Sequence, residues 1–298
     1  MVSIKRYFQD LRGKKSAVKR YTRSKAGNFL LVLFLVVGGL FSTLPLIYCV
    51  CTSFKPLDEL LIFPPRFFVK RPTIGNYAIL PDLMASLTVP LSRYIFNSLF
   101  ITLFTTFVYI LIGLMAAYSL SKGSFKGRNA IFWTVQFALM FNAYTLAVPQ
   151  YLIFSKLGMI DTYWIYILPP MASTLGVFLG KQYIEGYVPD ALLEAAKIDG
   201  ANQFKVFWSI VMPTIKPAWL TLLLFTFRDI WAMVPAGTIF SEELKTLPQV
   251  VTQITAGGTA RAGSAMAVTV IMMIPPILVF LISQSSVAES MSSAGIKE

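Results

Sequence analysis

The chain has 298 residues, of which 56% are hydrophobic and only 13% are charged, and its formal net charge is +12. A soluble domain carries roughly 25% charged residues and could not bury this much apolar surface in one core, so the composition predicts a membrane protein with several spans. The sequence contains no histidine, which removes the commonest general base and the commonest metal ligand. The two cysteines, Cys49 and Cys51, are too few for a disulfide framework or a closed zinc site, and we expect them to be packing residues.

Residues 1–28 form a basic N-terminal tail that contains nine of the 26 lysines and arginines. Such a tail directly before an apolar run favours a cytoplasmic flank along anionic lipid over a nucleic-acid-binding patch, so no nucleic-acid partner is expected. The segment Gly13-Lys14-Lys15-Ser16 is similar to the end of a phosphate-binding loop. It lacks the upstream glycine and the preceding strand, so we expect no nucleotide site in this chain.

Six apolar segments follow the tail, each long enough to cross a bilayer, which takes about 20 residues as a helix. The first exceeds the apolar region of a secretory signal peptide, so we expect it to remain as a span. Prolines and charges interrupt the fourth and fifth. The segments are Phe29–Cys51, Ile95–Leu120, Ile131–Phe154, Trp164–Tyr187, Pro217–Phe240 and Ala265–Ile282. They predict an all-α membrane domain with six transmembrane helices over residues 29–285, followed by a C-terminal tail over 286–298.

The distribution of basic residues predicts the orientation of these spans. With the N-terminus inside, seventeen lysines and arginines lie on the cytoplasmic side and eight on the outer side, so both termini are expected to be cytoplasmic. The longest outer connection is then Thr52–Arg93. Its six prolines disfavour a long regular helix. We expect an interfacial cap over the helix bundle, formed by the apolar residues Leu60, Leu61, Ile62, Phe63, Phe67 and Phe68.

One cytoplasmic loop, residues 188–213, is too polar to span the membrane and too patterned for a simple connector. It reads VPDALLEAAKIDGANQFKVFWSIVMP. Asp190 is expected to cap a helix that ends at Asp199-Gly200, because glycine readily adopts the left-handed conformation at a helix end. A second amphipathic helix follows, with Phe204, Phe207, Trp208 and Val211 expected on one side and Pro213 at its end.

This loop has the features of a docking element. Ala195 and Ala196 would leave a slim face for close approach by another protein, and Glu194 would offer a charge to a basic residue on that partner. From the residues alone, an ordinary amphipathic helix lying on the membrane surface remains the alternative.

The loop resembles the EAA signature of binding-protein-dependent ABC importers, which is Glu-Ala-Ala, three residues, Gly, nine residues, Ile, two residues and Pro. Met212 stands where the pattern usually has leucine, a change that conserves volume. The segments Ser53-Phe54-Lys55-Pro56, Asn97-Ser98 and Glu289-Ser290-Met291-Ser292-Ser293 are in turn similar to MalG-type permeases of oligosaccharide importers. The signature residues here are Glu194, Ala195, Ala196, Gly200, Ile210 and Pro213.

The resemblance implies a type I ABC importer permease fold in which the EAA loop forms a coupling helix docked on a cytoplasmic ATPase. Glu194 would pair with a basic residue of that ATPase, and Asp199-Gly200 would set the turn after the docked helix. This chain would then be no enzyme and hold no cofactor, with ATP and Mg²⁺ bound by the partner. The implied partners are a second permease, an ATPase dimer, an extracellular solute-binding protein, membrane lipid and an oligosaccharide substrate, all at a bacterial cell membrane.

Two groups of residues are candidates for the solute path. Arg228 and Asp229, next to Trp231, lie within the fifth apolar segment, where a charge costs at least about 2.5–3.5 kcal/mol and should face protein or water. Neighbouring helical residues diverge by about 100°, so we expect the two not to pair with each other unless the helix is broken. They either contact solute or tie the helix to the second permease. The other group, in the third span, is Gln136, Asn142 and Tyr144.

The outer loop Ser241–Arg261 ends in a glycine-rich run that contains Gly257, Gly258 and Arg261. In MalG-type subunits the corresponding loop reaches into the solute-binding protein, and flexible glycines suit that role as well as an ordinary mobile loop.

Three rival functions remain beside oligosaccharide import. The same importer could carry a polyol, a glycerol phosphate ester or a peptide. A secondary transporter would require inverted repeats and would leave the EAA loop unexplained. An intramembrane enzyme would require a nucleophile, base or metal set, which the absence of histidine and the scarcity of acidic residues disfavour.

Overall fold

The computed structural model describes residues 25–85, 89–141, 143–235 and 237–294, and the regular elements in these ranges are all helices. Most of the basic tail, with Gly13–Ser16, lies outside these ranges, as do Lys297 and Asn142. The chain divides into two compact units between Tyr48 and Cys49. The longer helices are α2 (Lys25–Ser53), α6 (Leu91–Lys122), α7 (Arg128–Ala138), α8 (Ala143–Lys156), α9 (Trp164–Met171), α10 (Leu175–Tyr187), α11 (Asp190–Ile198), α14 (Lys216–Trp231), α15 (Leu247–Thr255) and α16 (Ala262–Ala294).

Three helical stretches are long and apolar enough to cross a membrane: Ala26–Ser53, Leu91–Lys122 and Thr259–Gln284. They coincide with the first, second and sixth predicted segments. A further candidate consists of two helical stretches, Gln203–Thr214 and Lys216–Trp231, that meet at a bend of 80°. The helices predicted for the remaining segments are shorter than expected.

The third and fourth predicted spans are each broken into two helices. The third consists of α7 and α8, and the fourth consists of α9 and α10. Pro169 and Pro170 lie at the end of α9, where two successive residues without an N–H group weaken the helical ladder and the chain turns before α10. In the fifth predicted segment the helix, α14, ends at Trp231 rather than at Phe240. Gly237 beyond it has a left-handed conformation with a φ of 68°.

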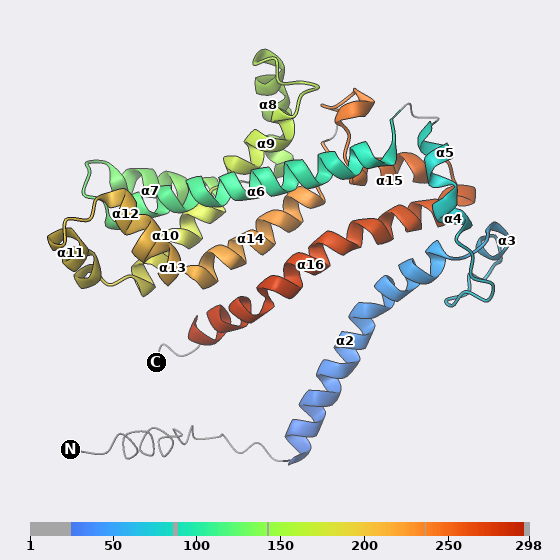
Figure 1. Cartoon of the computed structure of the whole chain (residues 1–298), viewed down its shortest axis with the longest axis horizontal. Helices are drawn as coiled ribbons and strands as arrows, with labels where there is room; N and C mark the ends of the chain where they lie inside the picture. The colour runs from blue at the N-terminus through green and yellow to red at the C-terminus, as the bar shows by residue number, and fades with distance from the viewer. Residues whose placement is uncertain (1–24, 86–88, 142, 236, 295–298) are drawn as a thin grey trace. The chain divides into compact units, whose positions relative to one another are not determined.

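The core of the second unit is built on α6, which packs against α10 and α14, while α16 packs along α14 (Figure 1). Glycines let α10 approach α6 closely. A Cβ atom at Gly176 would lie 2.7 Å from the Tyr109 hydroxyl, and one at Gly180 would lie 2.8 Å from Leu114 Cδ2. The four-residue spacing of these glycines places both on one helix face, the small-residue pattern common between membrane helices.

The segment that we expected to cap the bundle, Thr52–Arg93, has three short helices between α2 and α6 in its described residues: α3 (Leu57–Leu60), α4 (Gly75–Ala78) and α5 (Leu80–Ala85). Leu80 and Met84 are buried in a cluster with residues of α6, α14, α15 and α16, which confirms that this segment covers the helices. The apolar residues that we expected to do the covering are not those that do it. Phe63 is 92% exposed and Phe68 is 68% exposed.

Hydrogen bonds fold this segment onto itself. The Asn76 side-chain amide donates to the carbonyl oxygens of Ser53 and Lys55, both at 2.8 Å, and the Tyr77 hydroxyl donates to Ser53 Oγ at 2.9 Å. The two cysteines are free thiols, as expected, and Cys49 is buried with its sulfur 3.6 Å from Met266 Sδ.

Candidate functional site

The motif loop, residues 188–213, begins with α11. The helix starts at Asp190 itself, so Asp190 is its first residue and not the N-cap that we predicted; Pro189 occupies the cap position. The Asp190 carboxylate pairs instead with Lys122 at the end of α6, with Nζ 2.6 Å from Oδ1. The same ammonium donates to the Val188 carbonyl oxygen at 2.8 Å, so one lysine fastens the start of the loop to α6.

The charge of Lys122 has an electrostatic consequence for the helix start. Hydrogen bonding to Lys122, with its positive charge, holds the pKa of the Asp190 carboxyl below its usual value. The carboxylate also lies in the first turn of α11, where the helix dipole stabilises a negative charge.

The end of α11 follows the prediction. Gly200 adopts a left-handed conformation with a φ of 77°, and its N–H donates to the Lys197 carbonyl oxygen at 3.0 Å. Nothing lies within 4 Å of a Cβ atom built at Gly200, so the requirement for glycine comes from the backbone and not from crowding. Asn202 then caps the next helix, because its side-chain oxygen accepts from the Lys205 N–H at 2.8 Å.

The two alanines of the motif do not share a face. Ala196 is 9% exposed and belongs, with Leu193, to a buried cluster, whereas Ala195 and Glu194 are exposed. Adjacent helical residues point about 100° apart, which explains the division. One side of α11 therefore packs onto the protein while Glu194 and Ala195 face outward, free to meet another chain.

The second half of the loop is less regular than predicted. It consists of α12 (Gln203–Val206), a π-helical turn (Phe207–Val211) and α13 (Met212–Thr214). Phe207 and Val211 are buried, but Phe204 is 62% exposed and Trp208 is 40% exposed, so the four apolar residues do not form one buried side. Ile210 is half-buried beside the cluster that holds Val211, and Pro213 is exposed one turn before α14 begins. The loop thus runs, through the 80° bend, directly into α14.

A small cavity of about 190 Å³, here called the α14 cavity, lies at the other end of α14, and most of its lining is apolar. Asp229 and Thr226 of α14 line it, together with Tyr109 of α6 and Ser173 at the break between α9 and α10. The Tyr109 hydroxyl accepts from the Gly176 N–H at 2.6 Å and lies 3.4 Å from Ser173 Oγ. The break in the fourth predicted span therefore brings the Ser173 hydroxyl to a cavity that Tyr109 and Asp229 also line.

Arg228 and Asp229 pair with each other, contrary to our expectation. Arg228 donates from Nε and NH2 to Asp229 Oδ1 at 3.1 and 2.9 Å. Both lie in the last turn of α14, and the arginine side chain is long enough to reach its neighbour. Their side chains are 73% and 60% exposed, so this pair is open on one side of the described chain.

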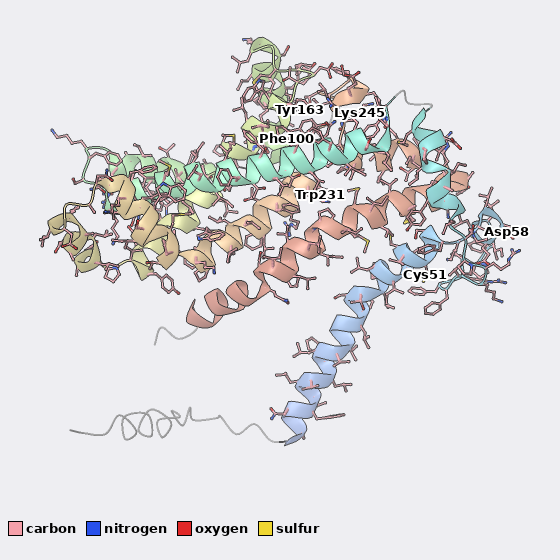
Figure 2. The ribbon with its side chains drawn as sticks, in the orientation of Figure 1. Cys51, Asp58, Phe100, Tyr163, Trp231 and Lys245 are labelled. Carbon is pink, nitrogen blue, oxygen red and sulfur yellow. The ribbon has the colours of Figure 1, made fainter. Side chains whose placement is uncertain are left out.

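The other predicted path residues are not part of this cavity. Trp231 is buried, and its indole N–H donates to the Met272 carbonyl oxygen of α16 at 3.0 Å, which gives it a packing role (Figure 2). Gln136 is half-buried on α7 and does not line the cavity. Asn142 and the side chain of Tyr144 lie outside the described part of the chain. The sequence missed Tyr109, Ser173 and Thr226, because only the packing of α6, α10 and α14 brings them together.

The segment Ser241–Arg261, expected to be a flexible loop, is largely helical. It contains α15 and two short 3₁₀ turns, η2 (Glu242–Leu244) and η3 (Thr259–Arg261). Gly257 and Gly258 form the exposed link between α15 and η3, and Gly258 has a φ of 80°. The Arg261 side chain lies against Gly257: a Cβ atom built at Gly257 would be 2.3 Å from Arg261 Cδ.

The start of α6 holds this segment in place. The Asn97 amide donates to the carbonyl oxygens of Glu243 and Lys245 at 2.7 and 2.9 Å, and Asn97 Oδ1 accepts from the Tyr163 hydroxyl at 2.9 Å (Figure 2). Ser98 Oγ accepts from the Leu247 N–H at 2.8 Å. Asn97-Ser98, which entered the sequence analysis only as part of a resemblance, thus has a physical role in fixing the chain before α15.

Asp161 provides a second attachment. Its carboxylate accepts from the backbone N–H groups of Phe240 and Ser241 at 2.9 and 2.8 Å and from the Ser241 hydroxyl. The hydrogen bond from the Ser241 hydroxyl, with those from the two N–H groups, holds the pKa of Asp161 below its usual value.

Comparison with known proteins identifies the family. Residues 109–293 match the family described as the inner membrane component of binding-protein-dependent transport systems, and this range includes the motif loop and the α14 cavity. The chain belongs to this family. As such a component it is a membrane-embedded transport subunit and not an enzyme, as predicted.

Relatives in this family cover nearly the whole chain. The inner membrane ABC transporter permease protein YcjP of Escherichia coli (strain K12) is 27% identical over 94% of this chain and 99% of its own length. The arabinooligosaccharides transport system permease protein AraQ of Bacillus subtilis (strain 168) is 29% identical over 90% and 95%. Among solved structures, a bacterial ABC transporter involved in the import of the acidic polysaccharide alginate has a chain with a TM-score of 0.72, 22% identity, and coverage of 88% and 98%. This likeness confirms the expected fold of a type I ABC importer permease.

Proposed function

We propose that this chain is the permease subunit through which an ATP-driven importer moves an oligosaccharide delivered by an extracellular binding protein. The observation that carries the proposal is the motif loop: in a chain of this family, Glu194 and Ala195 are exposed on a helix whose opposite side is buried in the protein. Sugar-transporting relatives such as AraQ support an oligosaccharide as the cargo.

The proposed membrane arrangement has six spans and two cytoplasmic termini. The spans are α2, α6, the pair α7–α8, the pair α9–α10, α14 and α16. Broken helices are compatible with a bilayer where the freed backbone groups are satisfied by protein or line a cavity. The break between α9 and α10 meets that condition, since the cavity with Tyr109 and Asp229 lies beside it. The motif loop is then cytoplasmic, and the segments 52–93 and 241–261 face the outside.

In the proposed mechanism, the ATPase subunits move the motif loop and the loop moves α14. Glu194 pairs with a basic residue of the ATPase, and closure of the two ATPase subunits tilts α11. The buried residues of α11 and the π-helical turn, Leu193 and Val211 among them, pack in the same cluster as Leu222 of α14. Displacement of the loop is therefore transmitted to the helix that carries Asp229, and the protein switches between inward-open and outward-open states by rigid-body motion.

The solute path is proposed to pass the cavity formed by Tyr109, Ser173, Thr226 and Asp229. Hydroxyl and carboxylate groups suit the hydroxyl-rich surface of a sugar, because a hydroxyl both donates and accepts hydrogen bonds and a carboxylate accepts them. The alternative is that Arg228 and Asp229 join this chain to the second permease, and their exposure fits both roles. Gly257, Gly258 and Arg261 are proposed to contact the binding protein from the exposed link on the outer side.

The proposal is tested by a transport assay. The complex is purified from its native membranes and reconstituted into proteoliposomes, and uptake is measured. Uptake of a labelled oligosaccharide should require both the cognate binding protein outside and ATP on the side of the motif loop. Uptake of a polyol, glycerol phosphate ester or peptide, and not of the oligosaccharide, would support the importer but contradict the proposed cargo. Uptake that proceeds without ATP and without the binding protein would refute the importer.

A further inference from the structure

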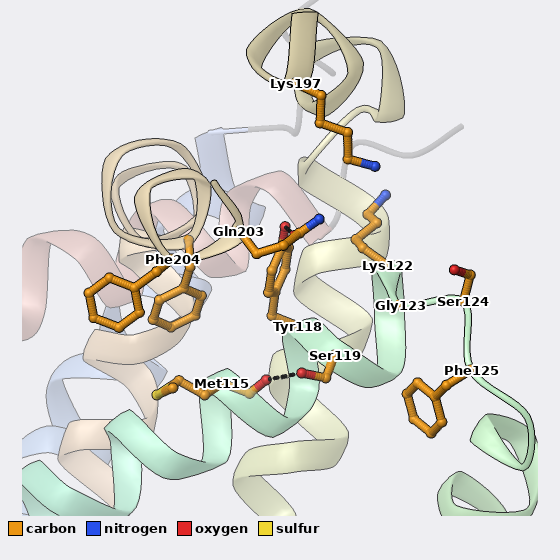
Figure 3. Close-up of a pocket in the computed structure, with 11 residues that line it drawn as sticks. Met115, Tyr118, Ser119, Lys122, Gly123, Ser124, Phe125, Lys197, Gln203 and Phe204 are labelled. Carbon is orange, nitrogen blue, oxygen red and sulfur yellow. Dashed lines mark hydrogen bonds between the residues drawn. The ribbon is translucent and has the colours of Figure 1, made fainter. Parts of the chain in front are cut away.

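A pocket of about 460 Å³ lies between the end of α6 and the motif loop (Figure 3). Its walls come from three parts of the chain: the last turns of α6, the residues directly after α6, and the helices α11 and α12. Residues from these parts that matter for its chemistry are Met115, Lys122, Phe125, Lys197, Gln203 and Phe204.

The polar side of the pocket presents hydrogen-bond donors and an excess of positive charge. Lys122 is fixed by Asp190 at 2.6 Å, whereas Lys197 forms no ion pair with a carboxylate in the described part of the chain. The Tyr118 hydroxyl donates to Gln203 Oε1 at 2.8 Å, which leaves the Gln203 NH₂ group to donate into the pocket. Figure 3 shows the Lys122 and Lys197 side chains extending toward one another above Gln203.

The remaining side of the pocket is apolar and open. Phe204 is 62% exposed, Phe125 is 44% exposed and Met115 is 40% exposed. An inorganic anion would contact the lysines and leave these side chains uncovered. A molecule with an anionic group joined to hydrocarbon chains satisfies both sides at once.

The position of the pocket along α6 fits the surface of a membrane. The helix has 32 residues and is about 48 Å long, which exceeds the roughly 30 Å hydrocarbon core, so its ends extend into the headgroup regions. Met115 to Lys122 are the last two turns. With the membrane arrangement of the proposed function, the pocket lies at the cytoplasmic headgroup level.

We propose that this pocket binds an anionic phospholipid, with the headgroup phosphate between Lys122, Lys197 and the Gln203 amide and the acyl chains beside Phe125 and Phe204. The inference rests on the proposed membrane arrangement. Because Lys197 and Gln203 belong to the motif loop and Lys122 belongs to α6, the bound lipid joins the loop to the span. The anionic lipid content of the membrane then influences how firmly the loop is held when the ATPase moves it.

The first test measures lipid binding to the assembled, delipidated complex by native mass spectrometry. Phosphatidylglycerol should bind more tightly than phosphatidylcholine with the same acyl chains. Lys197→Gln should weaken phosphatidylglycerol binding about fivefold, from the loss of one lysine charge near the surface. Lys126→Gln is the matched control, since Lys126 is exposed in the connection between α6 and α7, next to the pocket residue Phe125, but does not line the pocket. Equal weakening by both substitutions, or displacement of the lipid by excess inorganic phosphate, would overturn the proposal.

The second test identifies what occupies the pocket in the membrane. Phe125 is replaced by the photoreactive p-benzoylphenylalanine, and the complex is irradiated in vesicles of phosphatidylglycerol and phosphatidylcholine. Crosslinks to phosphatidylglycerol are expected. Crosslinks to the ATPase subunit instead would show that protein covers the pocket and would overturn the proposal. ATP-driven uptake is measured on the same preparation, so loss of the lipid site with intact uptake is distinguished from failure of the proposed transport function.

Discussion

The motif loop and the α14 cavity differ in how their candidate functional side chains are held. In the loop, one short segment supplies both the exposed Glu194 and the buried residues that support it, such as Leu193 and Ala196. In the cavity, Tyr109, Ser173 and Asp229 come from three elements that meet only in the folded chain. A docking element can therefore be read from local spacing, whereas a solute path depends on packing and, in a heteromeric importer, on a second subunit.

The largest effect on transport is expected from a substitution in the motif loop, at Glu194. Removal of its charge by Glu194→Gln should leave the partner's basic residue unpaired and lower ATP-driven uptake about thirtyfold or more, since truncating a buried interfacial charge pair costs at least about 2 kcal/mol. Uptake by proteoliposomes provides the measurement. Glu185→Gln removes the same charge outside the loop, where the carboxylate pairs with Lys181 of its own helix, and should leave uptake near its original rate. Equal losses in the two variants would count against docking at Glu194.

The turn after α11 gives a somewhat smaller effect. Gly200→Ala forces an alanine into the left-handed conformation at a cost of about 1–2 kcal/mol, and we expect about a tenfold loss of solute-stimulated ATPase activity as the docked helix shifts. Gly127→Ala is a matched control, because Gly127 also has a positive φ, of 89°, with nothing within 4 Å of a built Cβ atom. Both variants should lose similar thermal stability, and only Gly200→Ala should lose coupling. Loss of coupling in both would mean that general destabilisation is responsible.

A substitution of Asp229 tests whether the α14 cavity belongs to the solute path. If its carboxylate hydrogen-bonds to the solute, Asp229→Asn should raise the KM for uptake about fivefold, because the charged acceptor binds hydroxyl groups more strongly than an amide does. The complex should still purify intact. Dissociation of the second permease during purification, with an unchanged KM, would assign Arg228 and Asp229 to the subunit interface.

Asp161 gives the smallest effect, because it fixes the chain near α15 without taking part in coupling or transport. Asp161→Asn should lower the melting temperature of the complex by about 2–4 °C through weakened hydrogen bonds to the 240–241 backbone. The pKa of Asp161 is lowered in the folded protein, so its stabilisation is fully present above the ordinary aspartate pKa and is lost as the pH falls through the folded value. The difference in melting temperature between wild type and variant should therefore be constant near neutral pH and shrink only in strong acid. A difference that disappears near pH 6 would contradict this role.

The sequence predicted the fold class, the family and the motif loop because these depend on local signals. Apolar length located the helices of the first, second and sixth segments, and the spacing from Glu194 to Pro213 located the motif loop, whose coupling role is a proposal. The prolines of the fourth segment predicted an interruption there, and the structure breaks the helix just after Pro169 and Pro170. The break within the third segment was missed, because the apolar run over residues 139–141 continues the hydropathy pattern while the backbone leaves the helix.

Residues whose roles depend on long-range contacts were beyond the sequence. Asn97 and Ser98 carried a family resemblance but no physical role until the structure showed their hydrogen bonds to the chain before α15. Trp231 was a candidate for the solute path because of its position beside two charges, and its hydrogen bond to α16 could not be predicted from that position. Arg228 and Asp229 were expected to stay apart because helix geometry was considered without the reach of the arginine side chain.

The most direct test of the central claim is to purify this chain from its native membranes in mild detergent and identify its companions by mass spectrometry. The account predicts a second permease, an ATPase and an extracellular sugar-binding protein in the same preparation, and the ATPase should be lost first from the Glu194→Gln variant. A chain that purifies alone, and that still moves solute in liposomes without ATP, would contradict it.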